Sequence, residues 1–356
     1  MKTLILHFIV LLLFTTYSVS GQRLLISPKD SIWTYPIKSY PNRVPLIDSS
    51  SVFVGAEGSP VACIDKKTGK EKWKVTVDLS DYTDGFLHNI VEDTKGYIYF
   101  IGTSKDIFAV RKTDGKIRWR YPATFNDDLL NNITIHNDSL FFNTAENTFM
   151  ALSTSGKFLW NADLMSTCVG YTINNDKIYC LLQNGSICVL DKRDGTEIAN
   201  RKIFKSGDFS LSQPIIIDDI IVVNNKDNNT ILGLSKTTLG TKWSLSNFSG
   251  VCSENQSVYA YNSSAFERIE PKTGKTIWSI SGKYFNWFLQ PTEYESVLYL
   301  QTRFNFYLIN KENGKVVFSS EIEYKSYTKP IVEKTRIYLG YNNNYVAIKN
   351  PLTISK

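Results

Sequence analysis

The side chains that most often take part in catalysis are few in this sequence and lie far apart. Three His residues occur, and His7 falls in an apolar N-terminal segment, which leaves His88 and His136. Two imidazoles are too few for a His-rich metal centre. Acidic pairs such as Asp81 with Asp84 fall in stretches that we expect to be solvated loops. We therefore assign no general acid, general base or metal ligand to these side chains.

No spacing typical of a known catalytic motif occurs either. The sequence lacks G-x-S-x-G, a Walker-type phosphate loop, H-E-x-x-H and C-x-x-C. We therefore predict no catalytic residue, no cofactor-binding residue and no metal ligand, and we expect no bound cofactor.

The sequence contains five Cys residues, an odd number, so they cannot all pair within one chain. Cys180 and Cys188 flank Asn184-Gly185, which is typical of a two-residue hairpin turn. With such a turn Cys180 would face Val189, and the two thiols would point to opposite faces of the sheet. We expect all five side chains to be small buried apolar groups. They are Cys63, Cys168, Cys180, Cys188 and Cys252.

The composition is that of an ordinary globular protein. The chain has 356 residues, of which 42% are hydrophobic and 21% charged, and a formal net charge of +6. This balance excludes a disordered tail protein, a collagen and a small disulfide scaffold. The high aromatic content, with 20 Tyr and 20 Phe against 3 Met, favours strands over helices.

The N-terminal residues are typical of an export signal. Lys2 gives a positive end, residues 4–14 are almost wholly apolar, and Ser18-Val19-Ser20 offers small residues for cleavage. The apolar run is shorter than the ~20 residues of a membrane-spanning helix. We predict a signal peptide over 1–21 and a single mature domain over 22–356 with no transmembrane segment. The mature chain would be periplasmic or secreted.

A repeat organises the whole chain. Segments such as VACIDKKTGKEKW and FERIEPKTGKTIW share a glycine turn that is followed four residues later by an aromatic residue. Successive turn glycines are 34–46 residues apart, which is close to the period of a propeller blade. The repeated residues, together with the aromatic residue of an N-terminal strand, are Trp33, Gly69, Trp73, Gly115, Trp119, Gly156, Trp160, Gly195, Trp243, Gly274, Trp278, Gly314 and Phe318.

Each repeat also has two apolar strand-like runs upstream, so that it contains four antiparallel strands. Sets of three such strands occur eight times, but the last set has no fourth strand after it. We infer that the N-terminal strand 31–37, with Trp33 at the aromatic position, completes the last blade and leaves no open sheet edge. The sequence predicts an all-β, eight-bladed β-propeller of four-stranded antiparallel blades, with seven blades as the alternative.

Local chemistry explains the repeated residues. Gly adopts the positive φ of a tight turn at little steric cost, and Trp is a large flat surface that can cover the neighbouring blade. Ala199 replaces the aromatic residue in one repeat, and Leu239 occupies the glycine position of the next. We expect the blades with Ala199, Leu239 or Phe318 to pack less tightly.

The pattern A-x-D-x-x-T-G-x-x-x-W resembles the tryptophan-docking repeat of the pyrroloquinoline-quinone (PQQ)-like propeller family, best preserved from Cys63 to Trp73. The resemblance covers nearly the whole mature chain and implies one of two kinds of protein. One is the quinoprotein dehydrogenases, with PQQ and calcium. The other is non-catalytic and includes the propeller subunit of the outer-membrane β-barrel assembly machine, which is close to this chain in size. No adjacent Cys pair occurs, and no residue matches the family's catalytic Asp or calcium ligands.

Two surfaces are candidates for binding a partner. The seven turns between third and fourth strands contain 17 Lys or Arg residues and 8 Asp or Glu residues. One face would therefore be basic and attract an acidic partner, unless solvated turns simply favour Lys. On the opposite face, Phe285 and Trp287 would form a partner-binding rim, unless they begin the next inner strand and are buried. We expect no nucleic-acid partner for an exported chain with interspersed acids.

Together these observations predict a non-catalytic exported propeller that acts as a protein-binding scaffold in envelope or outer-membrane protein assembly. The expected partner is a protein. One alternative is a PQQ-dependent quinoprotein dehydrogenase, the only hypothesis that requires PQQ and calcium. Another alternative is a glycan-binding propeller.

Overall fold

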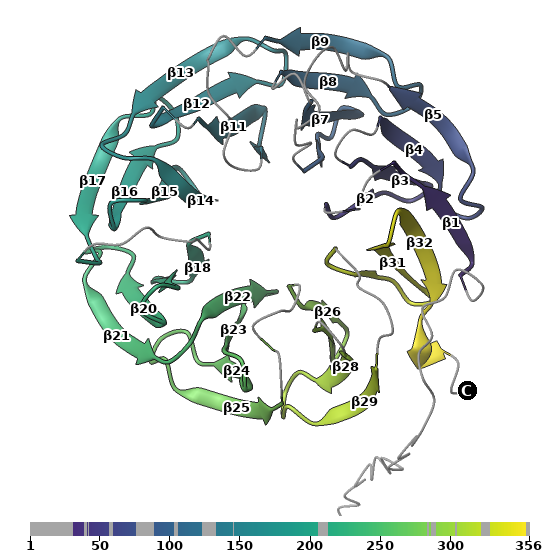
Figure 1. Cartoon of the computed structure of the whole chain (residues 1–356). Coiled ribbons are helices and arrows are strands. Elements are labelled where there is room, and N and C mark those ends of the chain that lie inside the picture. Colours follow the sequence, from purple (N-terminus) through teal and green to yellow (C-terminus); the bar gives the residue numbers. More distant parts are fainter. Residues whose placement is uncertain are drawn as a thin grey trace, which may run out of the picture.

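In the computed structural model, the described residues form eight four-stranded antiparallel sheets, arranged as the blades of a ring (Figure 1). The eight-bladed prediction is confirmed, and the seven-bladed alternative is wrong. No helix in the described part of the chain has the length and apolar character of a membrane span. The predicted signal peptide lies outside the described residues. These are 31–38, 41, 43–56, 60–75, 89–102, 106–122, 133–144, 146–205, 213–282, 285, 290–302, 305–321 and 328–353.

Each blade runs from an innermost strand at the ring centre to an outermost strand (Figure 1). Blades 1 to 8 follow the order of their innermost strands. The innermost strands are β2 (Leu46–Ile47), β6 (Val91–Glu92), β10 (Thr134–His136), β14 (Cys168–Asn174), β18 (Ile215–Ile217), β22 (Gly250–Glu254), β26 (Thr292–Tyr294) and β30 (Ile331–Val332). The second strands are β3 (Ser51–Val54), β7 (Tyr97–Ile101), β11 (Ser139–Asn143), β15 (Lys177–Leu182), β19 (Ile220–Asn225), β23 (Ser257–Tyr261), β27 (Val297–Gln301) and β31 (Arg336–Tyr341).

The outer half of each blade contains the third and fourth strands. The third strands are β4 (Val61–Asp65), β8 (Ile107–Arg111), β12 (Thr148–Ser153), β16 (Ser186–Asp191), β20 (Thr230–Ser235), β24 (Ala265–Ile269), β28 (Asn305–Asn310) and β32 (Asn344–Lys349). The outermost strands are β5 (Glu71–Val75), β9 (Ile117–Tyr121), β13 (Phe158–Asp163), β17 (Glu197–Lys202), β21 (Thr241–Ser246), β25 (Thr276–Ser281), β29 (Val316–Glu321) and β1 (Trp33–Pro36). A short 3-10 turn, η2 (Pro351–Thr353), follows β32.

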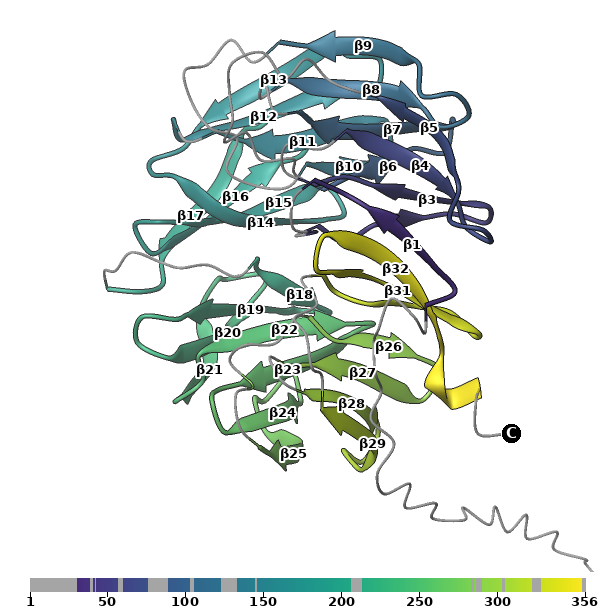
Figure 2. The same cartoon turned by 45° about the vertical axis from the view of Figure 1, so that its right-hand side comes forward.

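The N-terminal strand closes the ring. β1 pairs antiparallel with β32, with Trp33 opposite Ala347, and it forms the outer edge of blade 8 (Figure 2). The pairing extends beyond β1, because the amide of Ile32 donates to the carbonyl of Ala347 at 2.7 Å. The predicted closure of the last blade by the start of the mature chain is therefore confirmed.

The core is divided among the blade interfaces. The described residues form eight buried apolar clusters, and each cluster joins two neighbouring blades. A blade that lost its neighbour would expose a large apolar area, at a cost of roughly 25 cal/mol per Å². The ring is therefore stabilised as a closed unit.

In several blades, three side chains on adjacent strands form a row that ends at the tryptophan facing the next blade. In blade 2, Tyr99 on β7 faces Ala109 on β8, which faces Trp119 on β9. Because the alanine is small, the two aromatic rings meet across it with centroids 5.8 Å apart. Blades 1 and 3 have the equivalent rows Phe53–Cys63–Trp73 and Phe141–Ala151–Trp160.

A β-bulge lies beside this row. In blade 2, Ala109 pairs with Trp119 but the next residue, Val110, pairs with Ile117, so Arg118 is an extra residue on β9. The same register shift occurs between the third and fourth strands of blades 1 to 7. A bulge increases local twist and re-aims nearby side chains. It therefore helps to turn the tryptophan toward the next blade.

Each repeated tryptophan docks onto the glycine turn of the next blade. Trp73 lies flat on Gly115, which has a φ of 72°, and a Cβ on that glycine would lie 2.7 Å from the indole ring. The indole nitrogen of Trp73 donates to the carbonyl of Lys112 at 2.8 Å. Six of the eight junctions in the described chain have this contact. The pairs are Trp33–Gly69, Trp73–Gly115, Trp119–Gly156, Trp160–Gly195, Trp243–Gly274 and Trp278–Gly314.

The junction between blades 4 and 5 lacks this tryptophan and is filled differently. Ala199 lies opposite Val189, a larger residue than the small ones opposite most tryptophans. Leu239, at the glycine position of blade 5, is 4% exposed and packs in the same apolar cluster as Ala199. Arg201 replaces the indole donor, because its guanidinium donates to the carbonyl of Thr238 at 3.2 Å. Other side chains therefore fill this junction, and the looser packing expected there stays a prediction.

The junction between blades 7 and 8 is the other exception. Phe318 packs against a cluster that includes Ile337 and Ile348 of blade 8. Blade 8 has η2 in place of a glycine turn, since its fourth strand comes from the N-terminus. A side-chain hydrogen bond crosses this junction, because the hydroxyl of Tyr299 donates to Asn350 Oδ1 at 2.9 Å.

The docking contact predicts a difference between two glycines of blade 2. Gly96 has a φ of 89° and nothing within 4 Å of the position that a Cβ would take, whereas Gly115 lies under Trp73. Gly96→Ala should cost about 1 kcal/mol through backbone strain alone. Gly115→Ala should cost about 2–4 kcal/mol, because the indole must also move. Chemical denaturation of both variants measures this, and equal losses would contradict the docking role.

Because three side chains share the space between blades 4 and 5, the effects of substituting them on stability should depend on one another. Ala199→Trp alone should destabilise the chain by about 1–3 kcal/mol, because Val189 and Leu239 already occupy the space. The triple variant Ala199→Trp, Val189→Ala, Leu239→Gly should recover most of that loss. Melting temperatures of the single and triple variants, with Val189→Ala and Leu239→Gly as controls, measure the coupling. If the loss of stability in the triple variant equals the sum of the losses in the three single variants, these residues do not fill one space.

Candidate partner-binding face

Two sets of turns project from the same face of the ring. The strands of each blade alternate in direction, so the turns from first to second strand and from third to fourth strand lie at the same end. We call this end the turn face. It is the face that the sequence predicts to be basic.

Lysines of the outer turns reach acids of the inner turns, often across a blade junction. Lys112 of blade 2 places its Nζ 2.8 Å from Asp48 Oδ2 of blade 1 and 2.5 Å from Glu92 Oε2 of its own blade. Lys66 of blade 1 places its Nζ 2.6 Å from Glu333 Oε1 of blade 8. These ion pairs link neighbouring blades. They lie closer to the ring centre than the docked tryptophans, which are on the outermost strands.

This pairing reduces the positive charge that is predicted for this face. The side chains of Lys66 and Lys112 are only 16% and 17% exposed, so their charges are not presented to a partner. Some exposed turn lysines are paired in the same way, since the Nζ of Lys242 lies 2.7 Å from Asp219 Oδ2. The sequence could not show this, because the acids follow the first strands and come next to the lysines only when the blades assemble.

The opposite face was predicted to present an aromatic rim. Phe285 is 1% exposed, and its ring lies 6.1 Å from Phe266 and 5.9 Å from Tyr307, measured between centroids. The partner-binding role predicted for Phe285 is therefore wrong, because its side chain fills the junction between blades 6 and 7. Trp287 lies outside the described residues, so its role stays a prediction.

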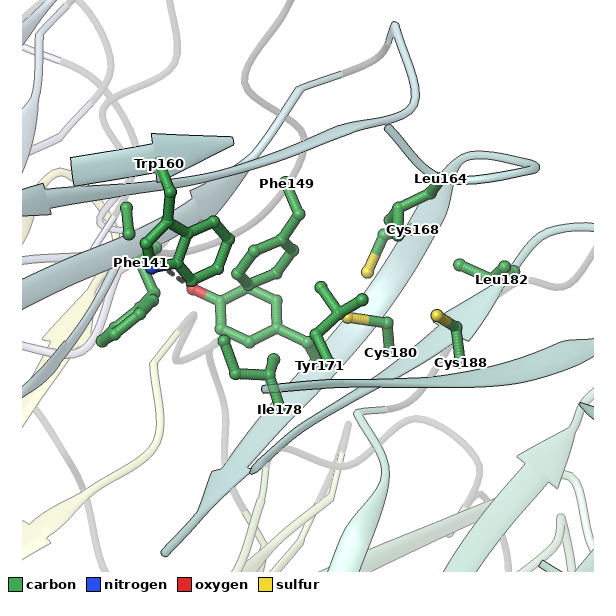
Figure 3. Close-up of a cluster of buried hydrophobic side chains, with 12 residues drawn as sticks. Phe141, Phe149, Trp160, Leu164, Cys168, Tyr171, Ile178, Cys180, Leu182 and Cys188 are labelled. Atoms are coloured by element: carbon green, nitrogen blue, oxygen red, sulfur yellow. Dashed lines mark hydrogen bonds between the residues drawn. The ribbon is translucent and has the colours of Figure 1, made fainter. Parts of the chain in front are cut away.

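All five cysteines are buried, as expected. Cys168, Cys180 and Cys188 lie side by side in the cluster between blades 3 and 4 (Figure 3). Cys180 and Cys188 are direct partners across β15 and β16, so the predicted opposite orientation is wrong. The turn is longer than two residues, because the amide of Gly185 bonds the carbonyl of Leu182, and a one-residue shift reverses every side chain.

The surroundings of Cys180 and Cys188 make their thiols unreactive. Burial raises the pKa of the Cys180 thiol well above its ordinary value, and burial followed by the charge of Glu197 raises the pKa of Cys188. A thiol that remains protonated is neither a good nucleophile nor a metal ligand. The cysteines of blade 4 therefore act as small packing groups.

Acidic side chains would have to supply part of a site for the calcium that accompanies PQQ in the quinoprotein dehydrogenases. Calcium takes about six to eight oxygen ligands, mostly from carboxylates and carbonyls. No three His, Cys, Asp or Glu side chains in the described ranges gather in a way that could hold a metal ion. No reaction step through PQQ is therefore derived from these residues.

The sequence matches the family described as outer membrane protein assembly factor BamB. The match covers residues 14–134 and 125–198, just over half of the chain. The chain belongs to this family. The matched part includes four tryptophans of the docking repeat, Trp33, Trp73, Trp119 and Trp160. No curated protein matches the sequence.

Solved structures share the fold of this BamB-family chain. BamB from Moraxella catarrhalis is 12% identical with a TM-score of 0.68, and the alignment covers 89% of this chain and 98% of that one. A europium-containing methanol dehydrogenase is 12% identical with a TM-score of 0.70, covering 87% and 85%. The computationally designed Ika8 protein is 11% identical with a TM-score of 0.73, covering 93% and 100%. At these identities the likeness shows the fold alone.

One junction on the turn face contains a histidine. His136, at the end of β10 in blade 3, has its Nδ1 3.2 Å from the Nζ of Lys192 in blade 4, so the neutral ring can accept a hydrogen bond there. Lys192 Nζ also lies 3.5 Å from Asp176. Burial, and then the positive charge of Lys192, lower the pKa of His136 below its ordinary value of 6.5.

This lowered pKa predicts a pH dependence of stability. The unfolded chain binds a proton at His136 more readily than the folded chain, so the stabilisation is complete above pH 6.5 and is lost as the pH falls through the folded pKa. His136→Gln, which keeps an acceptor for Lys192, should show a smaller fall in melting temperature between pH 7.5 and pH 5. If the melting temperatures of the unaltered chain and of His136→Gln fall equally with pH, His136 is not the source of the pH dependence.

Proposed function

We propose that this chain is an exported, non-catalytic scaffold that binds a protein partner during the assembly of outer-membrane proteins. The observation that carries the proposal is the family match over residues 14–198, because the family is described as an outer membrane protein assembly factor. The export-signal pattern over 1–21 supports a periplasmic location.

The construction of the ring suits such a role. Each docking contact uses a tryptophan, a glycine and a backbone carbonyl, so it leaves the exposed side chains of the turns free of this structural role. Eight apolar junctions and their ion pairs hold the turns in place. A surface that is already ordered loses little conformational entropy when a partner docks.

Affinity capture from the native host tests the proposal. The tagged chain is purified from membranes after mild crosslinking, with a tagged unrelated exported protein as the control. We expect outer-membrane assembly proteins to co-purify with this chain and not with the control. Deletion of the gene should also lower the amount of folded outer-membrane β-barrel proteins. Unchanged β-barrel proteins together with no specific co-purifying protein would refute the scaffold role.

The enzymatic alternative has a separate test. A PQQ-dependent dehydrogenase of this fold would oxidise an alcohol or sugar and reduce a dye after addition of PQQ and calcium. The observation that supports this alternative is the fold similarity to the methanol dehydrogenase. Saturable PQQ binding with turnover would replace the scaffold proposal. For the glycan-binding alternative, a glycan-array signal that is lost in Trp287→Ala would be decisive.

A further inference from the structure

We call the junction between blades 8 and 1 the closing seam, because it joins the C-terminal blade to the N-terminal blade. This junction contains a pocket on the turn face. It has a volume of about 370 Å³, and it lies between the inner and outer turns of blade 1 and the inner turn of blade 8. Its size is at the small end of the range for ligand pockets. The lining residues that matter here are Ser49, Asp65, Lys67, Glu333, Thr335 and Arg336.

The two acids of this pocket are already bonded. Glu333 accepts from Lys66 Nζ at 2.6 Å and from the hydroxyl of Tyr338 at 3.3 Å, one bond to each carboxylate oxygen. Asp65 accepts from both the amide and the hydroxyl of Thr68 at 2.8 Å. Both carboxylates therefore help to hold the turns of the pocket together.

Several donors of the pocket, by contrast, remain available. Arg336 uses its Nη1 to donate to the carbonyls of Lys66 and Lys67, at 2.7 and 3.3 Å, and its guanidinium also bonds the side chain of Tyr338. A guanidinium has five N–H donors, so these contacts leave some of them for a ligand. The ammonium of Lys67 has no hydrogen-bond or ion-pair partner within the described ranges. The side-chain hydroxyls of Ser49 and Thr335 likewise have none there. The pocket thus has an excess of donors and positive charge that lacks an acceptor.

We propose that this pocket binds a carboxylate side chain, Asp or Glu, from an acidic segment of a protein partner. The inference rests on the proposed partner-binding function and identifies the chemistry of the partner. A carboxylate has two planar oxygens that match a guanidinium edge, and it can take further bonds from an ammonium and hydroxyls. Asp65 and Glu333 line the same pocket, so a doubly charged phosphate would be repelled more strongly than a single carboxylate.

The position of the pocket links binding to ring closure. Arg336 and Thr335 belong to blade 8, whereas Ser49 and Lys67 belong to blade 1, so a bound carboxylate would bridge the two blades. Because the unfolded chain lacks the pocket, the ligand should also raise the melting temperature.

A peptide titration tests this site on the purified full chain. The probes are an acetylated and amidated pentapeptide that contains Glu and Asp, the same peptide with Gln and Asn, and inorganic phosphate. Calorimetry should show saturable binding of the acidic peptide, weaker at high salt, and no binding of the amide peptide. The acidic peptide should also raise the melting temperature, which the amide peptide should leave unchanged.

Two matched variants locate the site. Lys67→Ala removes the partnerless cation of the pocket, and it should weaken binding of the acidic peptide by roughly fivefold to tenfold. Lys70→Ala removes an exposed cation of the same turn that does not line the pocket, so it should bind like the unaltered chain. Equal effects of the two variants, equal binding of the two peptides, or binding of phosphate alone would overturn the proposal. Affinity capture of a partner would be unaffected by such a failure, so the two proposals fail separately.

Discussion

The fold depends on one contact, the docking of an indole onto a glycine turn of the next blade. The contact makes three demands at once. The turn residue must lack a Cβ, because one at Gly115 would lie 2.7 Å from Trp73. A carbonyl must face the indole nitrogen, as that of Lys112 does at 2.8 Å. A small residue such as Cys63 lies opposite most of the docked tryptophans, so that the ring can lie over it, although Trp278 lies opposite Arg268. At the six junctions that have the contact, its geometry therefore fixes the glycine and the tryptophan and favours a small residue opposite the indole.

The same demands explain why the architecture could be predicted from the sequence. The glycine and the tryptophan of one repeat are four residues apart, so their spacing is set by local geometry and is visible without a structure. The filling of the junction between blades 4 and 5, which lacks this contact, could not be predicted in the same way. Its replacement consists of Val189, Leu239 and Arg201, which lie on two blades and follow no repeated spacing. A missing motif residue therefore did not mean a missing interface.

The surfaces were harder to predict, because they depend on register and on distant partners. One additional turn residue placed Cys180 opposite Cys188 instead of Val189. Phe285 follows an outermost strand, and the rings of Phe266 and Tyr307 that bury it come from two different blades. The lysines of the turns were counted correctly, but the acids that pair with them are far away in the sequence. Glu333 is 267 residues from Lys66. Charge counted along a chain therefore overstates the charge of a face.

The closing seam needs more contacts than an ordinary junction, and the difference can be estimated. The cost of bringing two positions together grows as about (3/2)RT times the logarithm of their separation. The docked indole of Trp73 spans 39 residues, whereas Arg336 and Lys66 are 270 apart, so closure costs about 1.7 kcal/mol more. One hydrogen bond from a charged group contributes about 1.5–3 kcal/mol. The bond from Arg336 to the carbonyl of Lys66 is therefore of about the size needed to offset the greater span. The hydroxyl of Tyr345, which donates to the carbonyl of Gly55 at 2.7 Å, strengthens the seam further. A ring of this size can thus close through its chain termini without any covalent link between them.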